Sequence, residues 1–191
     1  MVIKDEKVRI AQYGQWDGYP GGQGKTALEF LMKADLRAFG YQLDKCKFVD
    51  DEKQKEIDAW FKSIGVNDGW MNMDQARQFK NKYPFFSRDN GANILNLVND
   101  FEGDTIWLGD ESNFVNDSLM NEWTYVIDLD KNTFEVYTGF NTKPLHKHER
   151  FYKNTPNEGG YYPVKNVAIY AINDLPTKEE FVKLESVESE E

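Results

Sequence analysis

The residues that could do chemistry are concentrated in one short segment near the start of the chain. Residues 13–24 contain five glycines and one proline, interleaved with tyrosine, tryptophan, glutamine and aspartate. Glycine at this density indicates backbone angles that other residues rarely adopt, or the close approach of another group. A plain turn does not require so many polar and aromatic side chains, so the segment predicts a functional site.

Three side chains of this segment are the candidate catalytic residues. Asp17 can act as an acceptor or general base, Gln15 can orient a carbonyl or a phosphate, and Tyr19 can donate a hydrogen bond. The candidate binding residues beside them are Tyr13, Trp16 and Lys25. The last of these begins a predicted helix, whose N-terminus would attract an anion. A glycine-rich turn held by buried tyrosine, tryptophan and glutamine hydrogen bonds explains the same residues equally well, so both interpretations stay open.

The segment does not match a phosphate-binding P-loop. That motif is G-x-x-x-x-G-K-[ST], and Gly24, Lys25 and Thr26 fit its end. Its first glycine would stand at the position that Tyr19 occupies. No early strand ending in aspartate follows, so nucleotide hydrolysis of the P-loop type is not predicted.

The two histidines form a second candidate site. His146 and His148 could act as a general acid–base pair on an RNA phosphodiester, with Lys147 or Arg150 stabilising the charge. A metal site with Glu149 would need ligands that the sequence does not identify, so neither a metal nor a cofactor is predicted. An exposed, solvated basic loop is the favoured interpretation. Its basicity still makes this loop the best candidate for contact with nucleic acid.

The composition argues against several classes of protein. A net charge of −10 and a pI of about 4.8 leave the chain without the basic character of a nucleic-acid-binding domain, and disfavour adsorption to anionic membranes. The acidity indicates either simple solubility, which is favoured, or a surface that competes with nucleic acid for a basic groove on a partner. No apolar stretch reaches the roughly 20 residues of a membrane helix, and the start lacks a signal-peptide core. We therefore expect a cytoplasmic protein of a bacterial host cell.

Two further features are weaker signals. Cys46 is the single cysteine, which rules out an intramolecular disulfide. Its two lysine neighbours could lower its pKa, although an incidental thiol is the favoured interpretation. Asp110, Glu111 and Asp117 form an acidic stretch that could bind a cation, but their spacing matches no calcium loop.

Hydrophobic periodicity predicts an α+β fold. Alternating apolar residues indicate a strand at 7–13, a hairpin with strands at 123–129 and 133–137, and a last strand at 167–172. Helices are expected at 25–39, 52–63, 73–82, 91–101 and 175–184, with a short strand at 105–108. We expect an antiparallel sheet, made of the N-terminal strand, the central hairpin and the late strand, packed with several helices.

The length predicts one α+β domain over residues 1–184. Within it, residues 141–165 are polar and rich in glycine, proline, asparagine and lysine, which is typical of a long loop insertion. Residues 185–191 are serine and glutamate with one valine, so we expect a disordered acidic tail.

The motif Gln15-Trp-Asp-Gly-Tyr-Pro-Gly-Gly-Gln-Gly24 resembles the Q-x-D-G-Y-P-x-G-x-G opening of a family of small bacterial and phage proteins. Further similarity lies in residues 87–95, 122–129 and 134–139, so the resemblance covers most of residues 7–140. Type II-A anti-CRISPR proteins of Gram-positive phages and mobile elements look similar, and some of them act through the guide RNA. The histidine loop at 141–165 has no counterpart in the resemblance.

The resemblance implies a phage or mobile-element counter-defence protein. Such a protein would inhibit a Cas9-type RNA-guided nuclease by binding it or its guide RNA, or by promoting truncation of that RNA. Two alternatives stay open. One is a stand-alone hydrolase or nuclease with its site at the glycine-rich junction of residues 13–25, and the other is a bacterial protein without catalysis.

Overall fold

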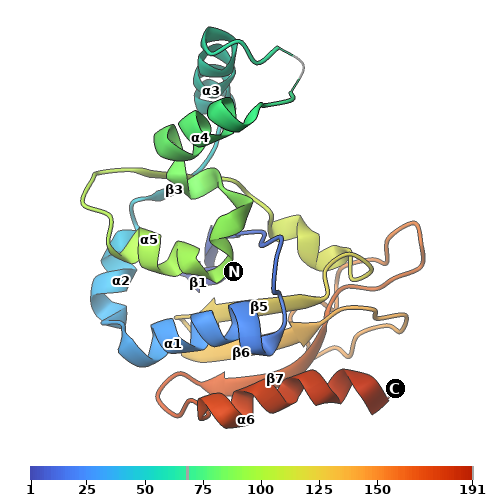
Figure 1. The fold of residues 1–191 in the computed structure, drawn as a ribbon. Coiled ribbons are helices and arrows are strands. Elements are labelled where there is room, and N and C mark those ends of the chain that lie inside the picture. Colours follow the sequence, from blue (N-terminus) through green and yellow to red (C-terminus); the bar gives the residue numbers. More distant parts are fainter. Residues whose placement is uncertain (68, 191) are drawn as a thin grey trace.

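A five-stranded sheet forms the centre of the computed structural model, which describes residues 1–67 and 69–190 (Figure 1). Its strand order is β2-β1-β5-β6-β7, and only β1 and β5 run parallel as neighbours. The bounds are β1 Val2–Lys4, β2 Lys7–Ile10, β5 Trp123–Asp128, β6 Thr133–Thr138 and β7 Lys165–Ala171. The predicted α+β fold with a mostly antiparallel sheet is confirmed.

The N-terminal strand is a hairpin rather than the single strand expected at 7–13. Asp5 and Glu6 join β1 to β2 and both have left-handed backbone angles, with φ of 55° and 58°. The carboxylate of Asp130 accepts the backbone N–H groups of both residues, at 2.8 and 2.7 Å, and so holds the turn. A three-residue strand is too short to show alternation in the sequence, which is why β1 escaped prediction.

The helix expected at 25–39 is two helices, α1 Lys25–Lys33 and α2 Leu36–Leu43. Ala34 is extended, with φ of −74° and ψ of 142°, and ends α1. The side chain of Asp35 accepts the backbone N–H groups of Arg37 and Ala38 and caps α2. The apolar residues continue at helical spacing from α1 into α2, but the extended Ala34 and the Asp35 cap divide them into two helices.

Two short strands and one more helix complete the body. Strands β3 Cys46–Phe48 and β4 Ile106–Leu108 form a separate parallel pair. Helix α5 Ile94–Asn99 follows the 3-10 helices η2 Pro84–Phe86 and η3 Arg88–Asn93 and contacts both α1 and α2. The main core lies between these helices and the sheet, and its fully buried side chains include Leu28, Phe39, Leu43, Val98, Ile106, Phe134 and Phe181.

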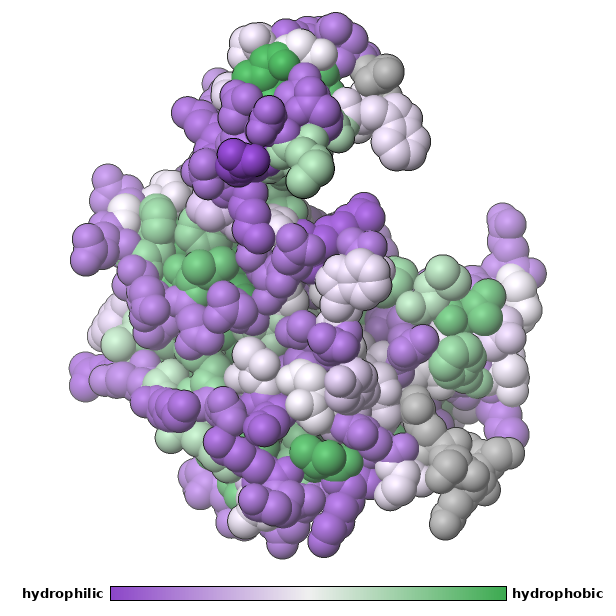
Figure 2. All heavy atoms as spheres, viewed as in Figure 1, coloured by the Kyte–Doolittle hydropathy of each residue, from purple (hydrophilic) through white to green (hydrophobic). Residues whose placement is uncertain are grey.

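Helices α3 Asp51–Ser63 and α4 Met73–Lys82 form an arm that stands away from the sheet at the top of Figures 1 and 2. Both helices were expected within one residue of these bounds. Aromatic packing holds the pair together, since the rings of Phe61 and Phe79 stack at 5.1 Å and those of Trp60 and Tyr83 meet edge-on at 5.4 Å. The arm has a small aromatic core of its own.

The stretch from 141 to 164 contains no helix or strand, as expected of a long loop, but it is anchored at several points. Phe151 and Val164 are buried against Tyr137 in a second apolar cluster. The side chain of Asn141 is buried and donates to the carbonyl oxygen of Pro163 at 2.9 Å. This loop is therefore built into the fold.

The C-terminal segment, whose residues 185–191 we predict to be a disordered acidic tail, is described as far as Glu190. Helix α6 Lys178–Val182 begins with a capping box of Thr177 and Glu180, and continues as the 3-10 helix η5 Lys183–Glu190. The side chain of Glu185 accepts the backbone N–H of Gly21 at 2.6 Å. This contact places the start of the predicted tail against the glycine-rich segment, and residue 191 lies outside the described residues.

Candidate functional site

The glycine-rich segment closes on itself through its own backbone. It consists of an irregular stretch after β2 and a short π-helix, η1 Pro20–Gly24. Asp17 has a left-handed φ of 54°, and its carbonyl oxygen accepts the backbone N–H of Gln23 at 2.8 Å. A Cβ on Gly22 would lie closer than 3.0 Å to that same carbonyl oxygen, a separation that real Cβ atoms essentially never show. Glycine at position 22 is thus required by close backbone approach.

Gln23 braces this segment against η3. Its side-chain oxygen accepts the backbone N–H of Ala92 at 2.7 Å, and its side-chain nitrogen donates to the carbonyl of Trp16 at 3.0 Å. Gly91 makes room for it, because a Cβ there would collide with the Gln23 amide and its φ of +46° favours glycine. Gln23 was not among the predicted site residues, although its partner Ala92 and the neighbouring Gly91 both belong to the 87–95 motif.

Tyr125 on β5 braces the other side of the segment. Its hydroxyl donates to the carbonyl of Gly18 at 2.8 Å, and a Cβ on Gly24 would lie 2.6 Å from its ring. A turn held by tyrosine and glutamine hydrogen bonds is therefore part of the explanation of the motif. Trp16 contributes only its backbone carbonyl to this scaffold, and its side chain is 63% exposed.

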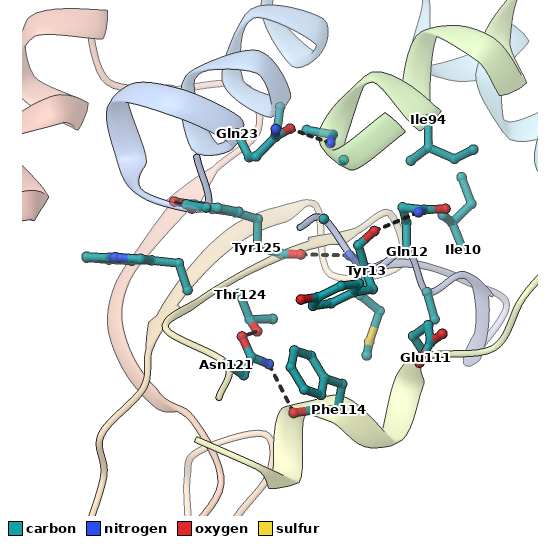
Figure 3. A pocket seen from close by; sticks show the side chains of 18 of the residues that line it. Ile10, Gln12, Tyr13, Gln23, Ile94, Glu111, Phe114, Asn121, Thr124 and Tyr125 are labelled. Atoms are coloured by element: carbon teal, nitrogen blue, oxygen red, sulfur yellow. Dashed lines mark hydrogen bonds between the residues drawn. The ribbon is translucent and has the colours of Figure 1, made fainter. Parts of the chain in front are cut away.

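The scaffold presents the predicted catalytic residues to one cavity of about 410 Å³. Gln15, Asp17 and Tyr19 all line it. Tyr13, which follows β2, lines it as well (Figure 3). Lys25 and Trp16 do not line it. The segment is thus both a braced turn and one wall of a cavity. The structure shows the turn, and the role of these residues in catalysis or binding stays a prediction.

The opposite wall comes from η4 Ser112–Asn116 and the start of β5. The rings of Tyr13 and Phe114 meet edge-on at 5.1 Å, with Tyr13 near the middle of the cavity (Figure 3). The side chain of Asn121 donates to the carbonyl of Phe114 at 3.1 Å and accepts the Thr124 hydroxyl at 3.0 Å. Glu111 also lines this wall, and it is the one member of the predicted acidic stretch to do so.

The predicted catalytic side chains are open to a ligand. Within the described part of the chain, the side chains of Gln15, Asp17 and Tyr19 make no hydrogen bond or ion pair. All three are exposed. A general base is ordinarily held in place by a hydrogen-bonded neighbour, and such a neighbour is missing among the described residues. The cavity offers polar groups that a ligand can reach.

The histidine pair lies outside this cavity. The rings of His146 and His148 stack at 5.6 Å with an angle of 5° between their planes, and both side chains are exposed, as is Lys147. Glu149 accepts the backbone N–H groups of His146 and Asn166 and so holds the turn. Among the described residues, no group of three or more histidine, cysteine, aspartate or glutamate side chains could hold a metal ion.

Arg150, expected to contact nucleic acid, instead forms an internal ion-pair network. Its guanidinium donates to Asp128 at 2.6 Å and to both carboxylate oxygens of Glu135, one of them at 2.8 Å. The exposed fractions of the three side chains are only 16%, 2% and 5%. Ion pairs with Asp128 and Glu135 hold the Arg150 side chain inside the fold. The geometry therefore gives no support to the prediction that Arg150 contacts nucleic acid.

This network shifts the pKa values of its members. Burial alone would raise the pKa of Glu135, but hydrogen bonds from Arg150 and Tyr137 bring it below its ordinary value. Burial also works against the charged form of Asp128, and hydrogen bonds from the Lys131 backbone and from Arg150 lower its pKa overall. Both carboxylates are therefore held ionised, as partners of a buried cation.

Cys46 is inert in its surroundings. Cys46 begins β3, its side chain is buried in the main core, and burial raises the pKa of its thiol to about 12. The neighbouring lysines do not produce the lowered pKa that the sequence allowed for. The thiol belongs to the core.

None of the helices in the described part of the chain combines the length and the apolar character that a membrane span needs. Comparison with known proteins adds no relative. No protein-family model, no curated protein and no solved structure matches the chain.

Proposed function

We propose that this protein is a counter-defence protein of the anti-CRISPR type, which inhibits a Cas9-type RNA-guided nuclease by binding its protein component. The observation that carries the proposal is a long acidic run without a single basic residue. Residues 89–130 contain no lysine, arginine or histidine, and their carboxylates are Asp89, Asp100, Glu102, Asp104, Asp110, Glu111, Asp117, Glu122, Asp128 and Asp130. The choice of a Cas9-type nuclease as the partner rests on the resemblance of the glycine-rich motif to anti-CRISPR proteins.

The acidic run favours a protein target over RNA. Nucleases of this kind hold their guide–target duplex in a positively charged channel, which a negatively charged surface complements. Binding of RNA depends instead on lysine and arginine contacts to phosphates. The chain carries a net charge of −10, and Arg150, one of its basic candidates, is engaged inside the fold. We therefore favour direct binding of the nuclease over capture or truncation of its guide RNA.

A second candidate function is a stand-alone hydrolase or nuclease. The observation in its favour is that Gln15, Asp17 and Tyr19 line one cavity that solvent reaches. An Asp17→Asn variant separates the two, because it removes a base while keeping the shape of the side chain. Under the inhibitor hypothesis this variant weakens binding at most several-fold, whereas a hydrolase would lose its activity.

The test is a cleavage assay with several type II-A nucleases. Each nuclease is mixed with the protein before or after loading with guide RNA, and DNA cleavage and RNA length are measured. We expect inhibition with full-length RNA, stronger when the protein is added before the guide. Shortened RNA would support the truncation mechanism instead, and unchanged cleavage with all nucleases would contradict the proposal.

A matched pair of charge reversals adds a control. Glu102→Lys lies in the acidic run, and Glu52→Lys lies on the arm; both side chains are exposed. Each variant changes the net charge by the same amount. Inhibition should weaken with the first and stay near the wild-type level with the second, and equal effects would point to net charge alone.

A further inference from the structure

The geometry points to the cavity at the glycine-rich segment as a receptor for the guanidinium group of an arginine side chain on the partner nuclease, an inference that rests on the proposed function. Aromatic and acidic residues line the cavity, and among the described residues no lysine or arginine does. Ligand pockets in proteins usually measure about 300–1,000 Å³, and this one, at about 410 Å³, is of a size for one long side chain.

The walls are suited to a flat cation. Tyr13, Tyr19, Phe114, Trp123 and Tyr125 all line the cavity. Aromatic faces attract a guanidinium, which is planar and weakly hydrated and stacks on rings. The protein already uses this contact at the edge of the site, where the Arg88 guanidinium carbon lies 5.5 Å from the centre of the Tyr13 ring.

The rim supplies negative charge that is not used elsewhere. Asp17, Glu111 and Glu122 are among the residues that line the cavity, and all three are exposed. None of the three makes a side-chain hydrogen bond or ion pair within the described residues. By contrast, Asp128 and Asp130 from the same acidic run are engaged, the first with Arg150 and the second with the turn between β1 and β2.

No cation of the protein itself neutralises this rim from within the lining. The amino group of Met1 donates to the carbonyl oxygen of Tyr125 at 2.8 Å, and burial lowers its pKa to about 5. It is therefore neutral near pH 7. A positively charged ligand is attracted by these carboxylates, with Arg88 on the Tyr13 ring as a cation at the edge of the site, and a phosphate is repelled by Asp17, Glu111 and Glu122.

The lining also offers hydrogen-bond acceptors for a guanidinium. Gln15 is exposed and has a free side-chain oxygen among the described residues, and the carboxylates can accept two N–H groups side by side. The Asn121 amide is buried, and both of its ends are satisfied by Phe114 and Thr124. This amide therefore fixes the shape of the wall and is not free to bind a guanidinium. Selection of a guanidinium depends on the polar residues at the rim.

The first experiment compares three short capped peptides that differ at one position, which is arginine, citrulline or lysine. Citrulline keeps the shape of arginine without its charge. Each peptide is titrated into labelled full-length protein, and the amide signals of Tyr13 and Gln15 are followed by NMR. We expect arginine to bind at least tenfold more tightly than citrulline, and more tightly than lysine. Equal binding of citrulline, or binding of inorganic phosphate in place of arginine, overturns the inference.

The second experiment removes charge from the rim without changing its shape. A Glu111→Gln and Glu122→Gln double variant should bind the arginine peptide about tenfold more weakly, as the loss of two exposed ion pairs implies. The control is Glu102→Gln with Asp104→Asn, which removes the same charge from exposed residues of the acidic run outside the lining. An equal loss in the control overturns the inference, because general attraction would then explain the binding.

The nuclease assay separates failure of this inference from failure of the proposed function. If wild-type protein inhibits a nuclease and the Glu111→Gln and Glu122→Gln variant inhibits it equally well, the arginine site is overturned and the inhibitor function stands. If the arginine peptide binds but no nuclease responds, the proposed function and the nuclease as partner are overturned. Loss of both activities in the double variant, with a folded protein by circular dichroism, supports both.

Discussion

Replacing Gly22 by alanine should destabilise the fold far more than the same change at Gly18, four positions earlier in the motif. The new Cβ at position 22 would lie closer than 3.0 Å to the carbonyl oxygen of Asp17, which already accepts the backbone N–H of Gln23 at 2.8 Å. The clash costs about 1–3 kcal/mol as overpacking, and loss of the hydrogen bond costs about 1 kcal/mol. We expect Gly22→Ala to lower the free energy of unfolding by about 3 kcal/mol.

Gly18→Ala is the internal control. A Cβ there meets no atom within 4 Å, and its φ lies outside the left-handed region. The substitution should change stability by less than about 1 kcal/mol, with a small gain from the stiffer unfolded chain. The two variants share their location, their chemistry and their effect on the unfolded state, so the difference between them measures the packing of position 22.

The assay is thermal unfolding followed by circular dichroism, with urea unfolding as a second measure. For a chain of this length, 1 kcal/mol corresponds to roughly 2–4 °C in Tm, so Gly22→Ala should melt roughly 6–12 °C below wild type. Gly18→Ala should melt within about 4 °C of it. If both variants melt together, the close backbone approach does not constrain the motif, and a purely functional role of these glycines would explain them better.

The remaining predictions concern the buried groups. Arg150→Met should lower the free energy of unfolding by about 3–5 kcal/mol, because two buried carboxylates lose their cation. Lys147→Ala, at an exposed residue of the same loop, should change it by no more than about 0.5 kcal/mol. Urea titrations measure both. Since the pKa values of Asp128 and Glu135 are lowered in the fold, the unfolded state takes up protons first as pH falls. These two carboxylates should thus make stability decline through about pH 4 and below, and this acid decline should be shallower in Arg150→Met. Acid declines of equal steepness in the two proteins would contradict this. Cys46 should resist a thiol reagent at about pH 8 until urea is added, because its pKa is about 12, and rapid labelling of the folded protein would refute its burial.

Patterns that act over a few residues predicted much of the fold. The arm helices α3 and α4 begin at asparagine or aspartate caps and were expected to within a residue. The β5–β6 hairpin was predicted from alternating apolar positions and aromatic and β-branched residues on either side of a tight turn. These elements depend on neighbours in sequence, which is why periodicity and caps were sufficient.

The site depends on contacts that no local pattern contains. Gln23 meets Ala92 from a position 69 residues away in the chain, and the Tyr125 hydroxyl meets Gly18 from 107 residues away. The glycine-rich segment could be recognised as unusual from its composition, but the residues facing it across the cavity could not. Glu111 drew notice only as part of an acidic stretch, and Phe114 and Asn121 gave no signal.

For Arg150, the local sequence suggested an exposed residue, and the structure places it inside the fold. Beside two histidines and a lysine, it is typical of an exposed basic loop. Its partners Asp128 and Glu135 lie on β5 and β6, 22 and 15 residues earlier, and burial of the ion pair is decided by how the loop packs on the sheet. A charged residue can therefore be predicted to be exposed only if the fold does not pair it with an opposite charge in a buried position.

The most direct test of the central claim is to measure binding of this protein to a type II-A nuclease that carries no guide RNA. The two are mixed, and complex formation is followed by biolayer interferometry across a series of salt concentrations. We expect a complex without RNA whose affinity falls as salt rises, since an acidic surface meets a basic channel. A protein that binds the guide RNA alone, or that binds no nuclease at any salt concentration, would contradict the claim.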